Sequence, residues 1–290
     1  PLMPRTTTAT IGITGVTGHV GGAVSRALEE RGVAHRLLGR NPQRFDSRVA
    51  ASDGLLESAS LDFSDPERAA ESMKGLQTVF LVSAAETAER EAQQLAMVGS
   101  LSRAGVERVV YTSFASPSPT ATFTFARTHY ATEQAIERAG LEHTFLRDNF
   151  YLDVLPLFAG EDRVLRGPAG DGRVAAVARA DVADAAVAVL LDPQAHTRGA
   201  YTLTGPESLT MTEVAQILTR VTGQQYRYEA ETVEAAHESR AVLDPEPWEM
   251  EAWVSTYTAI ASGELAEVTQ DVRELTGHAA RSLEDVLRQR

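Results

Sequence analysis

The 290-residue sequence contains no cysteine. This absence excludes disulfide bonds, thiolate-based zinc sites and thiol nucleophiles, and it is typical of a protein from a reducing compartment. Basic residues are also few, 27 against 40 acidic ones, so the formal net charge is −13. A chain of this charge is not expected to bind DNA phosphates or anionic membranes by general electrostatic attraction. We therefore expect neither a nucleic-acid partner nor a membrane partner.

Long apolar runs are missing as well. The most apolar stretch, 182–191, is too short to span a bilayer and is interrupted by Asp184. The first ten residues are polar and lack the apolar centre of a secretory signal. These features predict a cytoplasmic protein. The seven histidines are scattered without a metal-ligand spacing, so no metal site is expected.

A glycine-rich turn near the start of the chain is the most informative segment. An apolar strand, Ala9–Thr14, leads into Gly15, Gly18 and Gly21, and helical apolar spacing follows over 20–28. In a dinucleotide-binding turn, the first glycine makes the tight turn, the second admits a phosphate and the third allows close helix–strand packing. The N–H groups of the new helix would then face a pyrophosphate. A tight turn without a ligand is the alternative.

The next strand, expected over 33–39, ends at Arg40. Dinucleotide folds usually select their cofactor at this point, where an acid would bind the ribose 2′-hydroxyl of NAD. A guanidinium suits the 2′-phosphate of NADP instead, through charge-assisted hydrogen bonds. Arg40, with Arg44 one turn further, therefore favours NADP(H). The alternative is a solvated surface arginine.

Strands and helices then alternate regularly. Further strands are expected at 54–61, 78–82, 108–112 and 141–146, with helices at 67–73, 87–104 and 125–139. Asp65 and Pro66 are a plausible N-cap and first residue of a helix. This alternation predicts an α/β Rossmann fold with a doubly wound parallel sheet. Asp62, Ser83 and Ala84 fall at carboxyl ends of strands, where such sheets bind ligands, and Asp62 is placed to meet an adenine amino group.

Beyond residue 150 the alternation fades. We expect a loop-rich segment over 160–172, short strands at 174–177 and 200–204, and a helix to Leu191 capped by Asp181. The rest, about 233–286, is expected to be mostly helical. The predicted domains are 1–150 for the dinucleotide and 151–290, smaller and mostly α, for the substrate, with segments around 174–204 as candidates to return to the first domain.

Several segments together resemble the NmrA-like group of atypical short-chain dehydrogenase/reductases, and within it the quinone oxidoreductase 2 and triphenylmethane reductase branch. The resemblance covers almost the whole chain. It is carried by residues 13–21, 39–42, 110–113, 128–133, 145–151, 170–175, 178–181 and 276–284.

This resemblance implies an NADPH-binding enzyme whose substrate sits between the sheet edge and the smaller domain. Implied phosphate contacts are Gly15, Val16, Thr17, Gly18, His19 and Val20, with Arg40 on the 2′-phosphate. Ser83, Ala84 and Ala85 would border the adenosine and ribose side. The further expected cofactor contacts are Asp62, Ser113, Glu133, Arg147, Asp148, Asn149, Phe150 and Arg179.

Typical short-chain reductases pair a tyrosine with a lysine four residues later, and the tyrosine protonates the alkoxide. Here Tyr130 is followed by Gln134, so the activating cation is missing. A phenol with a pKa of about 10 is a poor acid on its own at neutral pH. Tyr130 is thus either catalytic or an ordinary helix residue. The missing lysine favours acceptors that are already electrophilic and need mainly an oriented hydride donor.

The remaining candidates have open alternatives. His129 and Glu133 lie one helical turn apart and serve as a proton relay, as cofactor contacts or only as a helix-stabilising pair. Asn149 is a candidate to hydrogen-bond a carboxamide or a substrate oxygen. Phe150 and Tyr151 are candidates to stack on a flat ring, or else pack between domains. Trp253 is a candidate substrate contact or part of a small core.

The sequence therefore predicts an NADPH-dependent oxidoreductase that transfers hydride to a small quinone-like or other conjugated, electrophilic aromatic acceptor. A reductase for an aromatic natural product is one form of this hypothesis. The alternative from another class is an NmrA-type redox sensor that binds NADP(H) without turnover. A monomer or a homodimer is expected.

Overall fold

The computed structural model describes residues 9–289. Residues 1–8, which form most of the polar stretch behind the expected lack of a secretory signal, lie outside this range. The described chain forms two compact units that alternate along the sequence. Unit 1 runs to Ser113 and includes Ala131–Leu146 and Ala183–Tyr201, whereas unit 2 comprises Phe114–Tyr130, Arg147–Val182 and the chain from Thr202.

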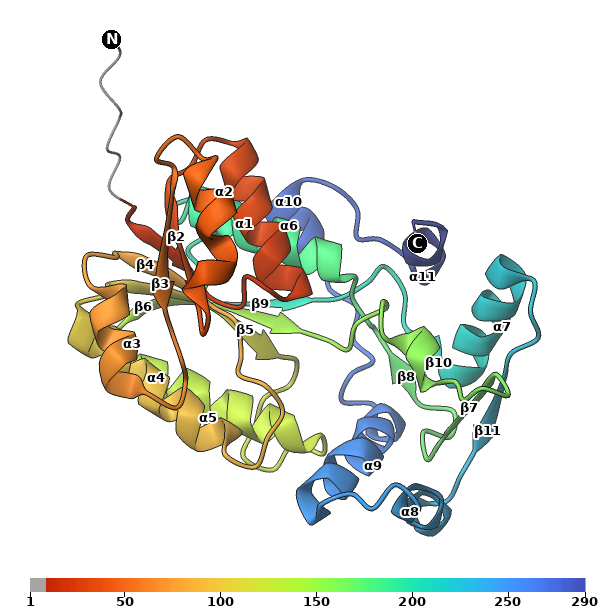
Figure 1. Cartoon of the computed structure of the whole chain (residues 1–290). Helices are drawn as coiled ribbons and strands as arrows, with labels where there is room; N and C mark the ends of the chain where they lie inside the picture. Colours follow the sequence, from red (N-terminus) through yellow and green to blue (C-terminus); the bar gives the residue numbers. More distant parts are fainter. Residues whose placement is uncertain (1–8, 290) are drawn as a thin grey trace. The chain divides into compact units, whose positions relative to one another are not determined.

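A seven-stranded sheet carries the fold, in the order β3-β2-β1-β4-β5-β6-β9 (Figure 1). The order reverses between β1 and β4, and the pairs β3–β2, β2–β1, β1–β4 and β4–β5 are all parallel. The predicted α/β doubly wound fold is confirmed. The strands are β1 (Ile11–Ile13), β2 (His35–Gly39), β3 (Leu56–Ser60), β4 (Thr78–Leu81), β5 (Arg108–Phe114), β6 (Glu142–Asp148) and β9 (Ala200–Leu203).

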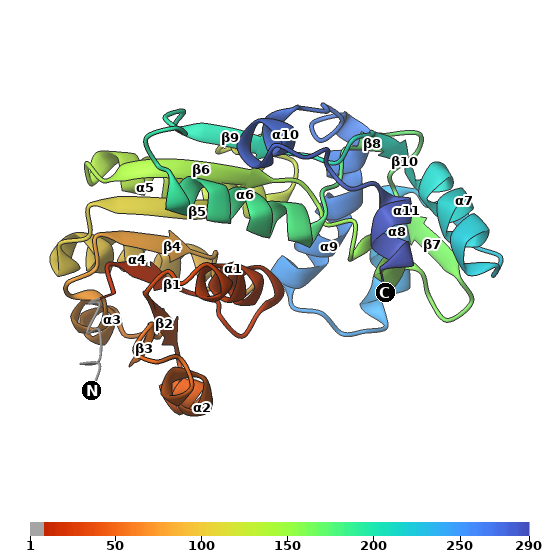
Figure 2. The same cartoon turned by 90° about the horizontal axis from the view of Figure 1, so that it is seen from above.

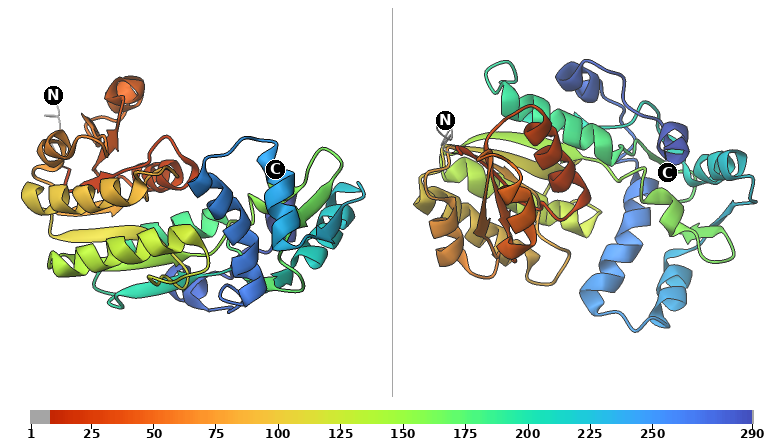
Figure 3. Two further views of the ribbon diagram at one scale, coloured as in Figure 1. Left: turned by 90° about the horizontal axis from the view of Figure 1, so that it is seen from below. Right: turned by 45° about the horizontal axis from the view of Figure 1, so that its top comes forward.

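Helices cover both faces of this sheet. On one face lie α1 and α6, seen in front of the strands in Figure 2, and on the other lie α3, α4 and α5, seen in the left view of Figure 3. Burial on both faces explains why Val79-Phe80-Leu81 is continuously apolar, with no exposed surface. The helical elements are α1 (His19–Glu30), η1 (Pro42–Phe45), α2 (Asp46–Ala50), α3 (Pro66–Met73), α4 (Arg90–Ala104), α5 (Thr124–Arg138) and α6 (Arg179–Leu191).

Local signals set the ends of several helices. Asp65 caps α3 by accepting a hydrogen bond from the Arg68 N–H at 3.1 Å, and Pro66 is its first residue, as predicted. Gly105 ends α4 with a φ of 78°, a conformation that glycine adopts without a steric penalty. The predicted elements of unit 1 are thus confirmed to within a few residues.

Unit 2 contains two small sheets and most of the C-terminal helices. Parallel pairing joins β7 to β11, and antiparallel pairing joins β8 to β10. The elements are η2 (Leu155–Phe158), β7 (Val164–Gly167), β8 (Arg173–Val174), β10 (Leu209–Thr210), α7 (Met211–Thr222), β11 (Arg227–Ala230), α8 (Val233–Ala241), α9 (Pro247–Ser262), α10 (Asp271–Thr276) and α11 (Leu283–Arg288).

The segment 160–172, expected to be loop-rich, consists mostly of turns and irregular chain, but the strand β7 lies within it and was not predicted. Its partner strand β11 follows some 60 residues later, and such a non-local pairing leaves no local signal. A Cβ on Gly167 would lie 2.2 Å from Cδ1 of Tyr257, so the glycine there allows β7 to pack directly on α9. The strand expected at 174–177 is also shorter than predicted, since β8 ends at Val174.

Asp181 was expected to cap α6, and this expectation is wrong. The helix begins at Arg179, so Asp181 lies in its first turn. The residue that binds the helix start is Asp153, whose Oδ2 accepts a hydrogen bond from the Arg179 N–H at 2.9 Å. Asp181 is fully buried and accepts hydrogen bonds from the backbone N–H, at 2.7 Å, and the guanidinium of Arg281.

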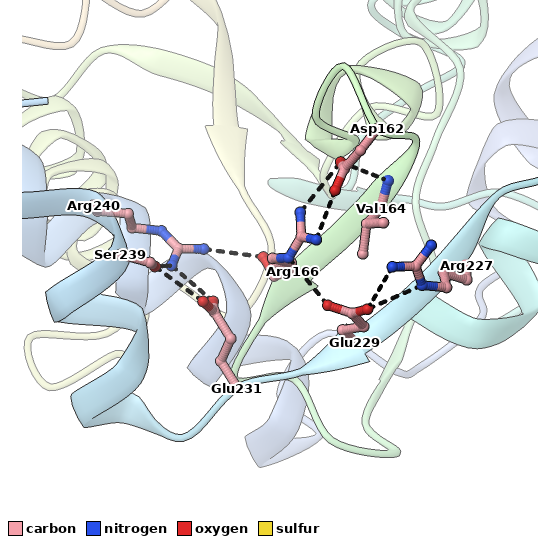
Figure 4. A network of polar contacts seen from close by, with 8 residues as sticks. All are labelled: Asp162, Val164, Arg166, Arg227, Glu229, Glu231, Ser239 and Arg240. Carbon is pink, nitrogen blue, oxygen red and sulfur yellow. Dashed lines mark hydrogen bonds and ion pairs between the residues drawn. The ribbon is translucent and has the colours of Figure 1, made fainter. Parts of the chain in front are cut away.

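Ion pairs stabilise the β7–β11 pairing of unit 2. Arg166 on β7 binds both Asp162 and Glu229, as Figure 4 shows. The guanidinium of Arg240 binds Glu231 at 2.8 Å and also donates to the backbone oxygen of Arg166 at 3.0 Å. Arg240 thus joins α8 to β7 and to Glu231, the residue that follows β11, and the Arg240 and Glu231 side chains are only 15% and 12% exposed.

The aromatic residues of α9 divide between core and surface. Tyr257 is buried, and Trp248 packs edge-to-face on Phe125 with ring centroids 6.3 Å apart. Trp253 is 36% exposed. Trp253, for which the sequence left open a substrate contact or a place in a small core, is thus the most exposed of these three residues. Among residues 9–289, no helix has the length and apolar content that crossing a membrane requires.

Candidate functional site

The glycine turn after β1 has the backbone geometry that its sequence predicts. Gly15 adopts a φ of +63°, which L side chains rarely adopt. A Cβ on Gly21 would lie 2.4 Å from the backbone oxygen of Gly15, so only glycine lets α1 pack this closely on the turn. Gly18 is the N-cap of α1 and provides no capping side chain.

The start of α1 leaves backbone donors open. The first helical hydrogen bond runs from the Gly22 N–H to the Gly18 oxygen at 3.1 Å. The N–H groups of residues 19–21 precede it and have no acceptor within the helix. Gly15, Thr17, Gly18 and His19 are exposed, while Val16 and Val20 anchor the turn in the core. An exposed turn with donors at a helix N-terminus fits a phosphate group.

Thr14 holds this turn against β4, a role that the sequence did not reveal. Its hydroxyl donates to the Phe80 oxygen at 3.1 Å and accepts from the Val82 N–H at 2.8 Å. Thr14 is fully buried. The sequence feature that could have predicted this role is a threonine at the end of an apolar strand, directly before the first glycine.

The segment after β4 is fixed by buried polar side chains. The Ser83 N–H donates to Oγ1 of Thr112 at 2.9 Å, and the Ala84 N–H donates to Oε1 of Gln94 at 3.0 Å. Gln94 in turn donates to Oγ1 of Thr132 at 2.8 Å. Gln94 and Thr132 were missed by the sequence analysis. They leave Ala85, the last of the three expected contacts, exposed.

Arg40 and Asp62 lie at the ends of neighbouring strands. Arg40 is exposed directly after β2, and the Leu61 N–H binds the Gly39 oxygen next to it at 3.0 Å. Oδ1 of Asp62 accepts from both the backbone and the hydroxyl of Ser64, which lowers the pKa of the Asp62 carboxyl, and the Arg40 charge lowers that pKa further. The guanidinium is thus available to an anion.

Ser113 and Glu133 form a buried pair in unit 1. The Ser113 hydroxyl, at the end of β5, donates to Oε1 of Glu133 at 2.6 Å. Both residues are 3% exposed. Because β1 to β5 run parallel, Gly15, Arg40, Asp62, Ser83 and Ser113 all belong to one edge of the sheet. This is the edge where doubly wound folds bind their ligands.

The structure gives Tyr130 no activating partner. Tyr130 is half-buried on α5, and no hydrogen bond of its hydroxyl occurs within residues 9–289. Gln134, which stands where a lysine would be expected, donates to Glu137 at 2.9 Å. The side chain that replaces the lysine is therefore engaged along its own helix.

His129 and Phe150 belong to an aromatic cluster of unit 2. The His129 ring is buried and stacks on Phe114 with centroids 6.2 Å apart. Phe150 packs on Phe114 and Phe123 at 5.1 and 5.0 Å. Phe150 therefore packs against other aromatic rings of unit 2, and its stacking on a ligand ring stays a prediction.

Asn149 organises the backbone after β6. Its Nδ2 donates to the Leu265 oxygen at 3.0 Å, and its Oδ1 accepts from the Phe150 N–H at 2.8 Å. Asn149 is 2% exposed. These bonds engage both ends of the amide in positioning the chain, and the role of Asn149 toward a carboxamide or a substrate oxygen stays a prediction.

Asp148 and Tyr151, which flank Asn149 and Phe150 in the sequence, are joined by a hydrogen bond. The Tyr151 hydroxyl lies 2.7 Å from Oδ2 of Asp148 and donates to it, and Asp148 is only 3% exposed. The guanidinium of Arg179 lies over the Tyr151 ring, 5.2 Å from its centroid. Arg147, at the end of β6, is half-buried. The sequence placed Asp148, Tyr151 and Arg179 near a ligand but did not reveal this contact.

Comparison with known proteins agrees with this geometry. The model of the NmrA-like family matches residues 7–272. A (4-alkanoyl-5-oxo-2,5-dihydrofuran-3-yl)methyl phosphate reductase from Streptomyces griseus subsp. griseus is 32% identical over 277 residues, which cover 94% of this chain and 95% of the relative. Quinone oxidoreductase 2 of Escherichia coli is 30% identical over 224 residues, 76% of this chain and 77% of the relative.

Solved structures extend the likeness. The NADPH complex of the Escherichia coli quinone oxidoreductase matches with a TM-score of 0.85 and 26% identity, over 96% of this chain and 99% of the other. Citrobacter sp. triphenylmethane reductase with NADP(H) matches with a TM-score of 0.81 and 26% identity, over 97% and 99%. Fold, glycine turn and relatives define an NAD(P)H-dependent oxidoreductase. The chain belongs to the NmrA-like family, as its sequence segments indicated.

Proposed function

We propose that this chain is an NADPH-dependent reductase that transfers hydride to a small quinone-like or other conjugated, electrophilic aromatic acceptor. The observation that carries the proposal is the assembly of the glycine turn and Arg40 at one edge of the parallel sheet, together with glutamine at position 134. The glycine turn and Arg40 suit a phosphorylated dinucleotide. Glutamine at position 134 means that the lysine cation used in ordinary carbonyl reduction is missing.

The residues present fit the cofactor. The open N–H groups at the start of α1 and the exposed Gly18 suit the pyrophosphate, where a side chain would stand in the way. Arg40 suits the 2′-phosphate, because it is exposed at the end of β2 and its planar fork matches phosphate oxygens. When bound, the reduced nicotinamide supplies the hydride. The chain's part is to hold that ring and the acceptor in a fixed orientation.

The missing lysine after Tyr130 supports an electrophilic acceptor. Tyr130 has no lysine beside it, so a simple ketone would receive no ready proton from this position. A quinone, an azo compound or a cationic dye is reactive enough to accept hydride without that help. The names of the quinone oxidoreductase and triphenylmethane reductase relatives support the same class.

The experiment that tests this proposal measures NADPH oxidation with a p-quinone, an azo compound, a cationic triphenylmethane dye and a simple aryl ketone. We expect turnover with at least one of the first three and little with the ketone. NADPH binding, followed by its fluorescence, is measured in parallel. Binding without turnover of any acceptor would contradict the enzyme proposal and favour an NADP(H) sensor. Rapid ketone reduction would contradict the proposed acceptor class.

A further inference from the structure

A chain of polar side chains joins the helix of the glycine turn to the segment that carries Arg40. Arg48, on α2, donates to Oε2 of Glu29, on α1, from both Nε and a terminal nitrogen, at 2.8 and 2.6 Å. The same terminal nitrogen donates to Oγ of Ser25, also on α1, at 2.9 Å. All four residues belong to unit 1. The planar guanidinium fork of Arg48 thus attaches α2 to α1 through a carboxylate and a hydroxyl.

His35, the first residue of β2, fixes the direction of the Ser25 hydroxyl. Both side chains are fully buried. Nδ1 of His35 lies 2.8 Å from the Val33 oxygen, which can only accept, so Nδ1 carries the ring hydrogen. Burial lowers the pKa of the His35 ring, although the hydrogen bond to Val33 acts in the opposite direction, and the ring is neutral at neutral pH. Nε2 therefore accepts from the Ser25 hydroxyl at 2.7 Å, which leaves the lone pairs of Ser25 for Arg48.

The segment between Arg40 and the end of α2 is attached to the rest of unit 1 by two kinds of contact. None of the five residues of α2 is buried, so this helix has no apolar anchor of its own. Phe45, directly before α2, is buried, and its ring would lie 3.1 Å from a Cβ on Gly39, the residue that precedes Arg40. The segment is thus held by the apolar packing of Phe45 and by the hydrogen bonds of Arg48.

The contact of Arg48 with α1 links the two phosphate-binding parts of the proposed cofactor site. The N-terminus of α1 carries the open N–H groups that suit the pyrophosphate, and Arg40 suits the 2′-phosphate. Both phosphates belong to one molecule and are joined through a single ribose, so the two parts of the site must be held at a matching separation. A segment that is fixed before binding loses less conformational freedom when the cofactor binds.

We propose that Arg48 is a specificity-determining positioning residue, which holds Arg40 at the separation from the N-terminus of α1 that NADPH requires and so sets a preference for NADPH over NADH. This inference rests on the cofactor assignment of the proposed function. Arg48 acts through Arg40, because its own guanidinium is engaged by Glu29 and Ser25 of α1.

The experiment measures the Kd of NADPH and of NADH by fluorescence titration of the full-length wild type, Arg48→Ala and Arg48→Lys. Arg48→Ala should raise the Kd of NADPH about tenfold, the loss expected when a freed side chain must be ordered on binding. The Kd of NADH should change less than about twofold, since NADH has no 2′-phosphate for Arg40. Arg48→Lys keeps the positive charge but lacks the fork, so a loss of about threefold for NADPH alone is expected.

Arg36→Ala is the matched control. Arg36 is a partly buried arginine of β2 that also pairs with a glutamate, Glu57, at 3.0 Å. It donates in addition to the backbone oxygens of Ser72 and Lys74, each at 2.9 Å. Arg36 makes no contact with α1 or α2 among these bonds, so its removal should destabilise unit 1 without changing the ratio of the two Kd values.

Two further readouts separate positioning from general stability. The double variant Arg40→Ala/Arg48→Ala should bind NADPH no more weakly than Arg40→Ala alone, because the effect of Arg48 passes through Arg40. Without cofactor, backbone amides of residues 40–50 should exchange hydrogen about tenfold faster in Arg48→Ala than in wild type. Arg36→Ala should leave the exchange of these amides unchanged.

The outcomes distinguish this inference from the proposed function. A wild type that prefers NADPH, with equal losses for NADPH and NADH in Arg48→Ala, would overturn the positioning role and leave the reductase proposal standing. Additive losses in the double variant would overturn it too. If Arg48→Ala does not fold, the ratio of the Kd values of Arg48→Lys decides. A wild type that binds NADPH no more tightly than NADH would overturn both the cofactor assignment and this inference.

Discussion

The Thr14 hydroxyl donates to the Phe80 oxygen and accepts from the Val82 N–H, and so joins the glycine turn to β4. The same strand continues into Ser83 and Ala84, whose N–H groups bind Thr112 and Gln94. The two segments that flank the reversal of strand order are therefore fixed by buried side-chain hydrogen bonds.

Replacing Thr14 by valine keeps the side-chain volume but leaves the Val82 N–H without its acceptor. We expect the free energy of unfolding to fall by about 1–3 kcal/mol, the usual cost of a buried unsatisfied donor. NADPH binding should weaken as well, because the turn is less firmly held. Urea unfolding and fluorescence titration measure the two effects. Thr14→Ser retains the hydroxyl, and a loss as large as that of Thr14→Val would contradict the assigned role.

Replacing Gly21 by alanine should disturb the turn itself. The new Cβ would lie 2.4 Å from the Gly15 oxygen, so helix and turn must separate. We expect the Kd for NADPH to rise by at least about tenfold, which corresponds to roughly 1.4 kcal/mol. The control is Gly99→Ala in the middle of α4, where nothing lies within 4 Å of the added atom. That variant should be stabilised by about 0.5–1 kcal/mol and bind NADPH normally.

Replacing Arg40 by alanine tests the cofactor preference. If Arg40 binds the 2′-phosphate, the Kd for NADPH should rise by about 10- to 100-fold, as for loss of a charge-assisted hydrogen bond. The Kd for NADH should change less than about twofold, since NADH has no 2′-phosphate. Arg68→Ala removes another exposed arginine of the same unit, on α3, and should leave both constants unchanged. An equal loss for the two cofactors would exclude the assignment.

Replacing Asp148 by asparagine should change how stability depends on pH. The pKa of the Asp148 carboxyl is about 8 in the folded protein, against 3.8 for an unperturbed group, so between these values the folded chain holds a proton that the unfolded chain releases. Wild-type stability therefore falls as the pH rises from about 4 to about 8. Asp148→Asn lacks this contribution.

Relative to wild type, Asp148→Asn should thus gain stability by roughly 1 kcal/mol per pH unit across that window. Denaturant unfolding at pH 5, 6 and 7 measures the slope. Asp171→Asn, at an exposed position, should show no comparable gain. Parallel stability curves for wild type and Asp148→Asn would mean that the folded protein does not hold this proton.

Sequence patterns were sufficient where the signal is local. The apolar strand before Gly15, the helical spacing after it and the Asp65–Pro66 start of α3 each depend on residues within one or two turns of chain. The pattern failed where pairing is non-local. Strand β7 was not predicted within the loop-rich segment 160–172, because its partner β11 is distant in sequence. Asp181 was expected to be a cap because a nearby aspartate is the commonest solution, but Asp153 binds that helix start.

By itself the sequence determined the fold class, the dinucleotide turn and the absence of a lysine four residues after Tyr130. These follow from steric freedom at glycine, from apolar periodicity and from residue identity, all of which can be read along the chain. Only the tertiary structure decided that Asp148 and Tyr151 are in contact. Their contact and the burial of Asp148 depend on the segments packed around the end of β6, and removal from water, rather than residue type, is what keeps a carboxyl group protonated.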